Sequence, residues 1–488
     1  MSAPARRWEG TYEMVVGLEV HVQLKTATKI FCRCSTDFGA PPNQHTCPVC
    51  LGLPGALPVL NDRAVELAVR AALALGCDVQ TTSIFARKNY FYPDLPKGYQ
   101  ISQFDRPLAT KGTVTIGWRP DGSPILVGIT RLHMEEDAGK SIHDRFPAAT
   151  AVDLNRAGVP LVEIVSEPEL RGSVEADAYL KTLKQILEYA DVSDVSMEEG
   201  SLRVDANIST RRIGETSLGT KTEIKNLNSF SGVVRALEAE YARQCGVRDA
   251  GGRIEQQTML WDANAGEVRP ARSKEGSHDY RYFPDPDLPP LILPIDRIDR
   301  IRRELPELPE ARRQRYAKEF ANLTPYDVEV LTSQAVLGDY FEQVARQSGD
   351  AKTSANWILG EVLAALNSTR QTIAHFTVRP ADLAALLRMV AEGVVSRTAA
   401  KQIFARMVAT GDPPDAIARR EGLKQVSDDG ALAAWVDEVF AENPGEAARF
   451  LGGETRLIGV LVGQVMRKSK GAADPKRVNQ LLTERIGK

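Results

Sequence analysis

Residues 14–24 read Met-Val-Val-Gly-Leu-Glu-Val-His-Val-Gln-Leu, and this stretch decides how the first half of the chain is interpreted. Apolar side chains occupy every second position from Met14 to Leu24, and the positions between them include Glu19 and His21. Successive side chains of a β-strand point to opposite faces of a sheet, so this period of two predicts a strand with one apolar face. Glu19 and His21 then share the opposite face.

Other parts of the first half show either strand-like or helical patterns. Strand-like runs occupy 125–134, 159–165, 202–209 and 220–226. Helical periodicity occupies 62–75, with Asn61 or Asp62 as its cap, 174–190 and 231–245, the last ending at Gly246. The strands and helices do not alternate as regularly as in a doubly wound parallel sheet. We therefore expect an α+β fold in which helices pack on a mainly antiparallel sheet.

The domain organisation is indicated by two proline-rich segments. The run at 283–290 is stiff and extended, and beyond it the pattern is helical to the end of the chain. A second boundary is indicated by Gly411-Asp412-Pro413-Pro414. We expect a sheet domain over 1–295, a helical domain over 296–410 and a helical tail over 411–488.

Composition limits the class of protein. The chain has 488 residues, 26% of them charged, and 61 Lys and Arg against 64 Asp and Glu give a net charge of −3. This is typical of a globular protein of several domains, and it excludes a uniformly basic nucleic-acid coat. The tail over 454–488 is nevertheless basic, with a local charge of +5. We expect no membrane span and no secretory signal, and therefore a reducing cytoplasm.

Four of the six cysteines follow a Cys-x-Cys-x12-Cys-x2-Cys pattern. Two close pairs joined by a loop can place four thiolates at tetrahedral corners, the arrangement that Zn²⁺ prefers. All four ligand positions would be filled, which favours structural rather than catalytic zinc; the alternative is four unrelated buried thiols. The four cysteines are Cys32, Cys34, Cys47 and Cys50. Cys77 and Cys245 stand alone and are expected in the core.

Several expected strands carry charged residues on the face opposite their apolar side chains. Burying an unpaired carboxylate is costly, so such groups are normally paired or hold a metal ion. A face rich in carboxylates, Lys and Arg suits Mg²⁺ and a nucleotide phosphate, and a salt-bridged sheet surface is an equally good explanation. The residues concerned include Glu19, His21, Glu135, Glu136, Glu163, Asp205, Lys221 and Lys225.

Familiar catalytic motifs do not account for this face. Ala138-Gly139-Lys140-Ser141 resembles the end of a phosphate-binding P-loop, but the first glycine of that motif would fall at Met134. The chain also has neither a Gly-Gly-Ser-Ser run nor a Gly-x-Ser-x-Gly nucleophile elbow. Two segments at 88–103 and 279–284 are dense in aromatic residues, and such segments can stack on bases or cover a ligand; the alternative is structural packing.

Seven motifs together resemble one family, the B subunit of the glutamine-dependent aspartyl/glutamyl-tRNA amidotransferase. They cover nearly the whole chain in order, and their length makes chance similarity implausible. The motifs lie at 16–21, 87–94, 99–103, 132–140, 153–156, 223–230 and 279–284.

The resemblance implies a cradle-shaped domain similar to glutamine synthetase and guanido kinases, then a helical domain, then a helical tail that contacts tRNA. It implies two partners, a glutaminase and a small third protein, which complete a heterotrimer. Such a chain uses ATP and Mg²⁺ to phosphorylate the side-chain carboxylate of misacylated Glu-tRNA(Gln) or Asp-tRNA(Asn). Ammonia from the glutaminase partner then displaces phosphate and forms the amide.

Carried over by motif, the resemblance implies that Glu19, His21, Glu136 and Glu163 line the catalytic site. The three carboxylates would hold Mg²⁺, and His21 would position substrate or take a proton. Weaker candidates for cofactor binding are Glu135, Asp205, Lys221 and Lys225. The four-cysteine zinc site is found in many members of the family. Two other interpretations remain: a non-catalytic zinc-containing RNA-binding scaffold, and a free-standing ATP-dependent amide ligase.

Overall fold

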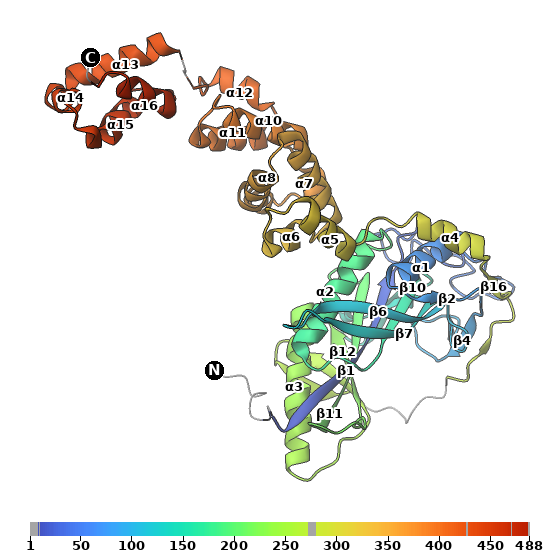
Figure 1. Cartoon of the computed structure of the whole chain (residues 1–488). Helices are drawn as coiled ribbons and strands as arrows, with labels where there is room; N and C mark the ends of the chain where they lie inside the picture. Colours follow the sequence, from blue (N-terminus) through green and yellow to red (C-terminus); the bar gives the residue numbers. More distant parts are fainter. Residues whose placement is uncertain (1–7, 9, 272–279, 426–427, 470, 487–488) are drawn as a thin grey trace. The chain divides into compact units, whose positions relative to one another are not determined.

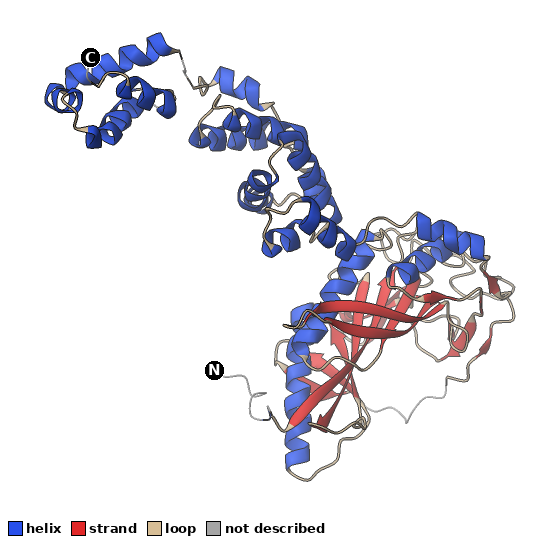
Figure 2. Ribbon diagram, in the orientation of Figure 1, coloured by secondary structure: helices blue, strands red, loops and turns tan. Residues whose placement is uncertain are grey.

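The computed structural model describes Trp8 and residues 10–271, 280–425, 428–469 and 471–486 (Figure 1). The chain divides into two compact units, Met1–Pro309 and Glu310–Lys488. The first combines strands with helices, and every described element that lies wholly within the second is a helix (Figure 2). No helix in these described ranges is long and apolar enough to cross a bilayer.

A nine-stranded sheet forms the centre of the first unit. Among the described strands of this sheet only the pair β12–β13 is parallel, so the expectation of an α+β fold built on a mainly antiparallel sheet is confirmed. The strands that correspond to the expected runs are β7, β10, β11 and β12. In spatial order the sheet consists of β14 (Glu267–Pro270), β13 (Thr258–Asp262), β12 (Thr222–Leu227), β11 (Leu202–Arg212), β1 (Tyr12–Gln23), β10 (Pro160–Ser166), β7 (Pro124–Glu136), β6 (Ala109–Trp118) and β2 (Asp78–Val79).

Helices cover one face of this sheet. The helices α1 (Asp62–Ala74), α2 (Ser173–Tyr189) and α3 (Phe230–Asp249), labelled in Figure 1, bury apolar residues in one core with Leu18, Val20 and Val22 of β1, which are fully buried. Asn61 caps α1 by accepting hydrogen bonds from the backbone of Arg63 and Ala64. The apolar half of the alternating pattern at 14–24 therefore faces the helices, and the polar half faces away from them.

The end expected for the third helix at Gly246 is wrong. Helix α3 continues through Gly246 to Asp249. It packs along α2 and β11, and this burial outweighs the cost of about 1 kcal/mol that a glycine imposes inside a helix. Cys245 on α3 and Cys77 are both buried, as expected for core thiols.

Short strands form smaller sheets at the edge of the first unit. One consists of β15 (Phe283–Pro284), β4 (Ala86–Asn89) and β5 (Tyr99–Ser102), so it joins the two aromatic segments that the sequence singled out. Its strand β5 packs against β7. The remaining pairs are β16 (Leu291–Ile292) with β3 (Thr82–Ser83), and β8 (Lys140–Phe146) with β9 (Ala149–Asp153).

The first unit extends past residue 295, where the sequence placed its end. Helix α4 (Ile295–Arg303) packs on α1, and its Ile298 and Ile301 are buried in the core of the first unit. Leu305 and Leu308, which follow α4, also pack against this core, and the compact unit ends at Pro309.

The second unit contains two separate hydrophobic cores. The first core is built by α5 (Pro309–Glu319), α6 (Pro325–Leu331), α7 (Ala335–Ser348), α8 (Ala351–Trp357), the π-helix η2 (Ile358–Val362), α9 (Leu363–Thr369), η3 (Ile373–His375), α10 (Pro380–Ala391), α11 (Arg397–Thr410) and α12 (Pro414–Arg420). The second core is built by α13 (Asp429–Glu442), α14 (Pro444–Leu451), η4 (Thr455–Leu457), α15 (Ile458–Lys468) and α16 (Pro475–Thr483).

The boundary expected at 411–414 falls inside the first of these cores. Gly411 ends α11 with a left-handed backbone. Helix α12 follows, and Ile417 and Ala418 are fully buried in the core that α11 belongs to. The change from one core to the next therefore lies between α12 and α13.

Candidate functional site

The polar face of the sheet carries one row of four functional side chains. Cross-strand pairing places Arg203, His21, Glu163 and His133 side by side on β11, β1, β10 and β7. The Nε2 atom of His21 lies 3.4 Å from a carboxylate oxygen of Glu163 and 3.5 Å from one of Glu135. His133 Nε2 lies 3.4 Å from Glu163 and 3.8 Å from Glu135. Two carboxylates thus lie between two imidazoles.

The charges in this row perturb one another strongly. Burial lowers the pKa of His133, but the carboxylates of Glu163 and Glu135 outweigh it and raise that pKa to about 9. The pKa of His21 is raised in the same way, against the effect of burial. Burial raises the pKa of Glu163, but the two histidines outweigh it and hold the pKa well below its usual range. Without a bound ion, the imidazoles of His21 and His133 and the carboxylates of Glu163 and Glu135 partner one another.

A second group of charges lies beside this row. Glu19 accepts a hydrogen bond from Asn207 at 2.9 Å and is paired across the strands with Asp205. Lys225 bridges Asp205 at 2.7 Å and Glu223 at 3.0 Å. Burial and the charge of Glu163 raise the pKa of Glu19. Lys221 is exposed and directly precedes β12.

The structure separates Glu136 from the residues with which the sequence grouped it. Glu135 and Glu136 are neighbours on β7, so their side chains leave opposite faces of the sheet. Glu136 is paired with Lys97 and accepts the backbone N–H of Ile101 at 2.8 Å. Glu135 is therefore the residue that joins His21 and Glu163. The strand predicted from the sequence ends at residue 134, so the sequence alone does not assign Glu135 and Glu136 to opposite faces of the sheet.

Two residues near the face were missed as site candidates. His133 is 3% exposed and shares its strand face with Glu135, a spacing of two that could have identified it. Lys88 lies on β4 with its ammonium 4.9 Å from the centre of the Tyr280 ring. Burial lowers the pKa of Lys88, but Glu135, Tyr282 and Glu163 outweigh it and raise that pKa. Lys88 therefore brings a positive charge to the two carboxylates.

The two aromatic segments meet beside this lysine. Tyr90 packs edge-on against Tyr280, with 6.1 Å between ring centres, and Tyr280 packs against Tyr282. Phe104 stacks on Tyr282 at 4.1 Å. The side chain of Asn89 donates to the backbone carbonyl oxygens of residues 280 and 281. These contacts make an aromatic wall at the edge of the polar face.

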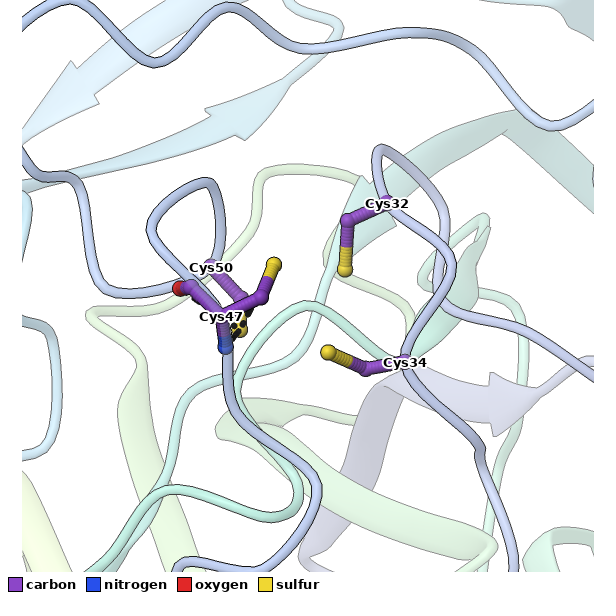
Figure 3. Close-up of side chains that lie close together, drawn as sticks. All are labelled: Cys32, Cys34, Cys47 and Cys50. Carbon is purple, nitrogen blue, oxygen red and sulfur yellow. Dashed lines mark hydrogen bonds between the residues drawn. The ribbon is translucent and has the colours of Figure 1, made fainter.

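The four cysteines of the expected zinc site converge as their spacing predicted (Figure 3). The segment that carries them, residues 32–50, is called the knuckle below. Their sulfur atoms all lie within 4.8 Å of one another. The Cys47 and Cys50 sulfurs are 3.9 Å apart, close to the roughly 3.8 Å that a tetrahedral Zn–S bond of about 2.3 Å requires. The backbone N–H of Cys47 donates to the Cys50 sulfur at 3.1 Å. The knuckle is compatible with structural zinc.

The knuckle cysteines also differ in their acidity. The thiol of Cys32 donates to Cys50, which lowers the pKa of Cys50 to about 4 against the effect of burial. The backbone of Cys47 and the positive charge of Lys29 act in the same direction. The knuckle thus contains a group that is ready to become a thiolate ligand.

The second cluster that could hold a metal ion consists of His21, Glu135 and Glu163, whose ligand atoms also lie within 4.8 Å of one another. Carboxylate oxygens are the ligands that Mg²⁺ prefers, and an imidazole nitrogen is accepted by several divalent metals. Two neighbouring carboxylates repel each other and gain from a cation between them. The donor set therefore fits a divalent cation, and the described residues contain two clusters of different chemistry that could hold a metal ion.

Comparison with known proteins agrees with these observations. Residues 14–299 match a family model described as the GatB/GatE catalytic domain, and residues 339–486 match one described as the GatB domain. A protein of Pelodictyon phaeoclathratiforme is 53% identical over 97% of this chain and 99% of its own length. Relatives in Geobacter sulfurreducens and Carboxydothermus hydrogenoformans are 52% and 50% identical, over 97% and 98% of this chain and 99% of their own lengths. All three are named as the B subunit of aspartyl/glutamyl-tRNA(Asn/Gln) amidotransferase, and this chain belongs to that family.

Proposed function

We propose that this chain amidates misacylated tRNA in two steps. It phosphorylates the side-chain carboxylate of Glu-tRNA(Gln) or Asp-tRNA(Asn) with ATP, and ammonia then displaces the phosphate. The observation that carries the proposal is the convergence of His21, Glu135 and Glu163 on the polar face of a chain that belongs to this amidotransferase family. Free carboxylates are poor acyl donors, and the first step supplies a better leaving group.

Mg²⁺ is the cation that this donor set would hold. His21, Glu135 and Glu163 would bind it, and Asp205, on the neighbouring strand β11, would complete the shell or hold a second ion. When bound, Mg²⁺ supplies positive charge that neutralises the phosphate oxygens in the transition state. In this arrangement His21 acts as a ligand, because its Nε2 faces two carboxylates and is not available to accept a proton.

Two lysines would receive the negatively charged reactants. Glu135 and Glu163 act on Lys88, Asp205 and Glu223 pair with Lys225, and both lysines keep their positive charge against burial. They would orient the triphosphate and the substrate carboxylate, so that a substrate oxygen attacks the γ-phosphorus as its bond to the β–γ bridging oxygen breaks and ADP leaves. Lys221, exposed next to β12, would contact the phosphate tail.

Glu19 is the best candidate to take up a proton in the second step. Nitrogen attacks the acyl carbon, the C–N bond forms, and phosphate leaves with its bond electrons. The attacking nitrogen must lose a proton, and the raised pKa of Glu19 makes it a stronger base than an ordinary carboxylate. One oxygen of Glu19 accepts from Asn207, and no donor to the other is found among the described residues, so that oxygen remains available.

The wider assembly follows from the same proposal. The first unit would be a cradle similar to glutamine synthetase and guanido kinases. A glutaminase partner would release ammonia from glutamine, and a small third protein would complete a heterotrimer. The basic tail around 454–488 would contact tRNA, and zinc at the knuckle would be structural.

The test follows oxygen from substrate to phosphate. The full chain is assembled with the glutaminase and the small third protein, and is given ATP, glutamine and Glu-tRNA(Gln) labelled with ¹⁸O in the side-chain carboxylate. The expected result is one ¹⁸O in inorganic phosphate for each amide formed. Glu135→Gln should abolish both products, whereas Glu267→Gln, exposed on β14, should change neither. Amide without labelled phosphate would refute the phosphorylation step.

The same experiment distinguishes the two other interpretations. An assembled complex that binds tRNA but forms no amide would indicate an RNA-binding scaffold. Labelled phosphate formed equally well from free glutamate, without tRNA, would indicate a free-standing amide ligase.

A further inference from the structure

Lys29 is a lysine in an unusual environment. It is fully buried, in the segment between β1 and the first pair of cysteines. Its ammonium donates to the carbonyl oxygens of His45 at 2.7 Å and Leu154 at 3.2 Å. Among the described residues it forms no ion pair with a carboxylate. Backbone carbonyls satisfy hydrogen bonds but do not neutralise a charge, and an uncompensated buried charge is strongly unfavourable.

The nearest carboxylate does not supply the missing charge. Glu136, Lys29 and Cys50 surround Gly158: a methyl group added there would lie 3.5 Å from Cδ of Lys29, 3.6 Å from Cβ of Cys50 and 3.9 Å from a Glu136 oxygen. Glu136, however, is already paired with Lys97. The knuckle is therefore the other source of negative charge beside Lys29.

The knuckle offers most negative charge when it holds metal. Four thiolates around Zn²⁺ carry a net charge of −2, whereas in the metal-free knuckle only Cys50 has a lowered pKa, about 4. Lys29 and two of the cysteines, Cys32 and Cys50, line the same cavity of about 210 Å³. We propose that Lys29 is the counter-charge of the four-cysteine zinc centre, and that zinc binding strengthens the charge pairing that makes its burial favourable.

The hydrogen bonds of Lys29 show what this charge pairing would hold in place. His45 lies in the loop between the two cysteine pairs, and Leu154 lies in the turn at 153–156 that the sequence singled out as a motif. Asn155 of that turn accepts the backbone N–H of His45 at 2.8 Å and donates to Pro41. Lys29 thus joins the zinc loop to the turn that precedes β10.

The test compares the zinc-loaded and zinc-free forms of the full chain. Lys29→Met removes the charge and the hydrogen bonds, and Lys29→Gln removes the charge but keeps a donor. Lys25→Met is the matched control, because Lys25 is exposed and its ion pairs are with Asp191 and Asp194. Zinc affinity is measured by competition with a chromogenic chelator, and stability of both forms by denaturant unfolding.

Both Lys29 variants should bind zinc about 10–100-fold more weakly than wild type, the usual loss when a partner outside the ligand shell is removed. Lys25→Met should bind zinc as wild type does. In the zinc-free form Lys29→Met should cost less stability than in the zinc-loaded form, because the metal-free knuckle offers Lys29 less negative charge.

Three results would overturn the proposal. The first is unchanged zinc affinity in both Lys29 variants. The second is full recovery of affinity in Lys29→Gln, which would assign the role to hydrogen bonding alone. The third is a Lys29→Met chain that is destabilised equally with and without zinc, or that fails to fold in either form, which would make Lys29 a general packing residue.

Discussion

Two adjacent glutamates on β7 should respond to the same substitution in opposite ways. Glu135 faces His21 and Glu163, whereas Glu136 faces Lys97 on the other side of the sheet. We compare Glu135→Gln with Glu136→Gln, which change one charge each at neighbouring positions. The readouts are affinity for Mn²⁺, a spectroscopic substitute for Mg²⁺, and stability.

The expected magnitudes follow from what each carboxylate touches. Removing a partner outside the ligand shell costs about 10–100-fold in metal affinity, so loss of the ligand Glu135 should cost more than about 100-fold, or about 2.7 kcal/mol. The stability cost of Glu135→Gln should be only about 1 kcal/mol, because Glu163 remains between the two histidines.

Glu136→Gln should have the reverse profile. The side chains of Glu136 and Lys97 are 3% and 9% exposed, and breaking a buried ion pair costs about 3–5 kcal/mol because one charge is left unpaired. Its Mn²⁺ affinity should stay within a few-fold of wild type.

Both quantities are measured on the full chain. Mn²⁺ binding is followed by electron paramagnetic resonance, and stability by hydrogen exchange of the amides in β1 and β10, which report on the first unit. Equal losses of Mn²⁺ affinity in the two variants would refute the assignment of Glu135 and Glu136 to opposite faces. No Mn²⁺ binding to wild type would refute the metal site itself.

Three further predictions test other features of the chain. With no divalent cation added, His133 should stabilise the fold fully below its unfolded pKa of about 6.5, and this contribution, on the order of 1–3 kcal/mol, should be lost as pH rises through about 9. The free energy of urea unfolding, measured between pH 6 and 10, checks this, and the same dependence on pH in His133→Gln would contradict it. Truncation after residue 424 removes the second core of the second unit, so it should leave the other two cores folded and weaken tRNA binding at least about tenfold. Truncation after residue 410 should also destabilise the core that buries Ile417 and Ala418. Calorimetry measures the stability and filter binding the tRNA affinity, and unchanged tRNA affinity would move the RNA contact elsewhere. Tyr179→Phe should be neutral or stabilise the chain by about 1 kcal/mol, because its buried hydroxyl has no hydrogen-bond partner among the described residues; a clear loss in thermal unfolding would contradict this.

Local patterns predicted the elements of the first unit well. The alternation at 14–24 indicated which side chains of β1 face the helices, and Asn61 caps α1 as expected. The predictions failed where burial between distant segments overrode a local signal. Helix α3 continues through Gly246, and α4 and α12 join cores from which proline-rich segments were expected to separate them.

The site shows the same division between local and tertiary information. Cysteine spacing was sufficient to predict the knuckle, because all four ligands lie within one short loop of 19 residues, 32–50. The expected strand ended at residue 134, so the alternation offered no reason to choose Glu135 over Glu136. In the structure β7 continues to Glu136 because Pro160 and Leu161 of β10 pair with its last two residues, and this pairing fixes the direction of both side chains.

The sequence by itself determined the alternation of β1, the cysteine knuckle, the family and the set of charged residues from which a site could be built. Each of these depends on neighbours within a few residues or on the order of motifs along the chain. Only the tertiary structure decided which of these charges meet. His21, Glu135 and Glu163 come from three strands, and Lys29 reaches Leu154 from 125 residues away. Pairing and burial of a charge depend on every segment that excludes water from it, so they become defined only when the strands are side by side.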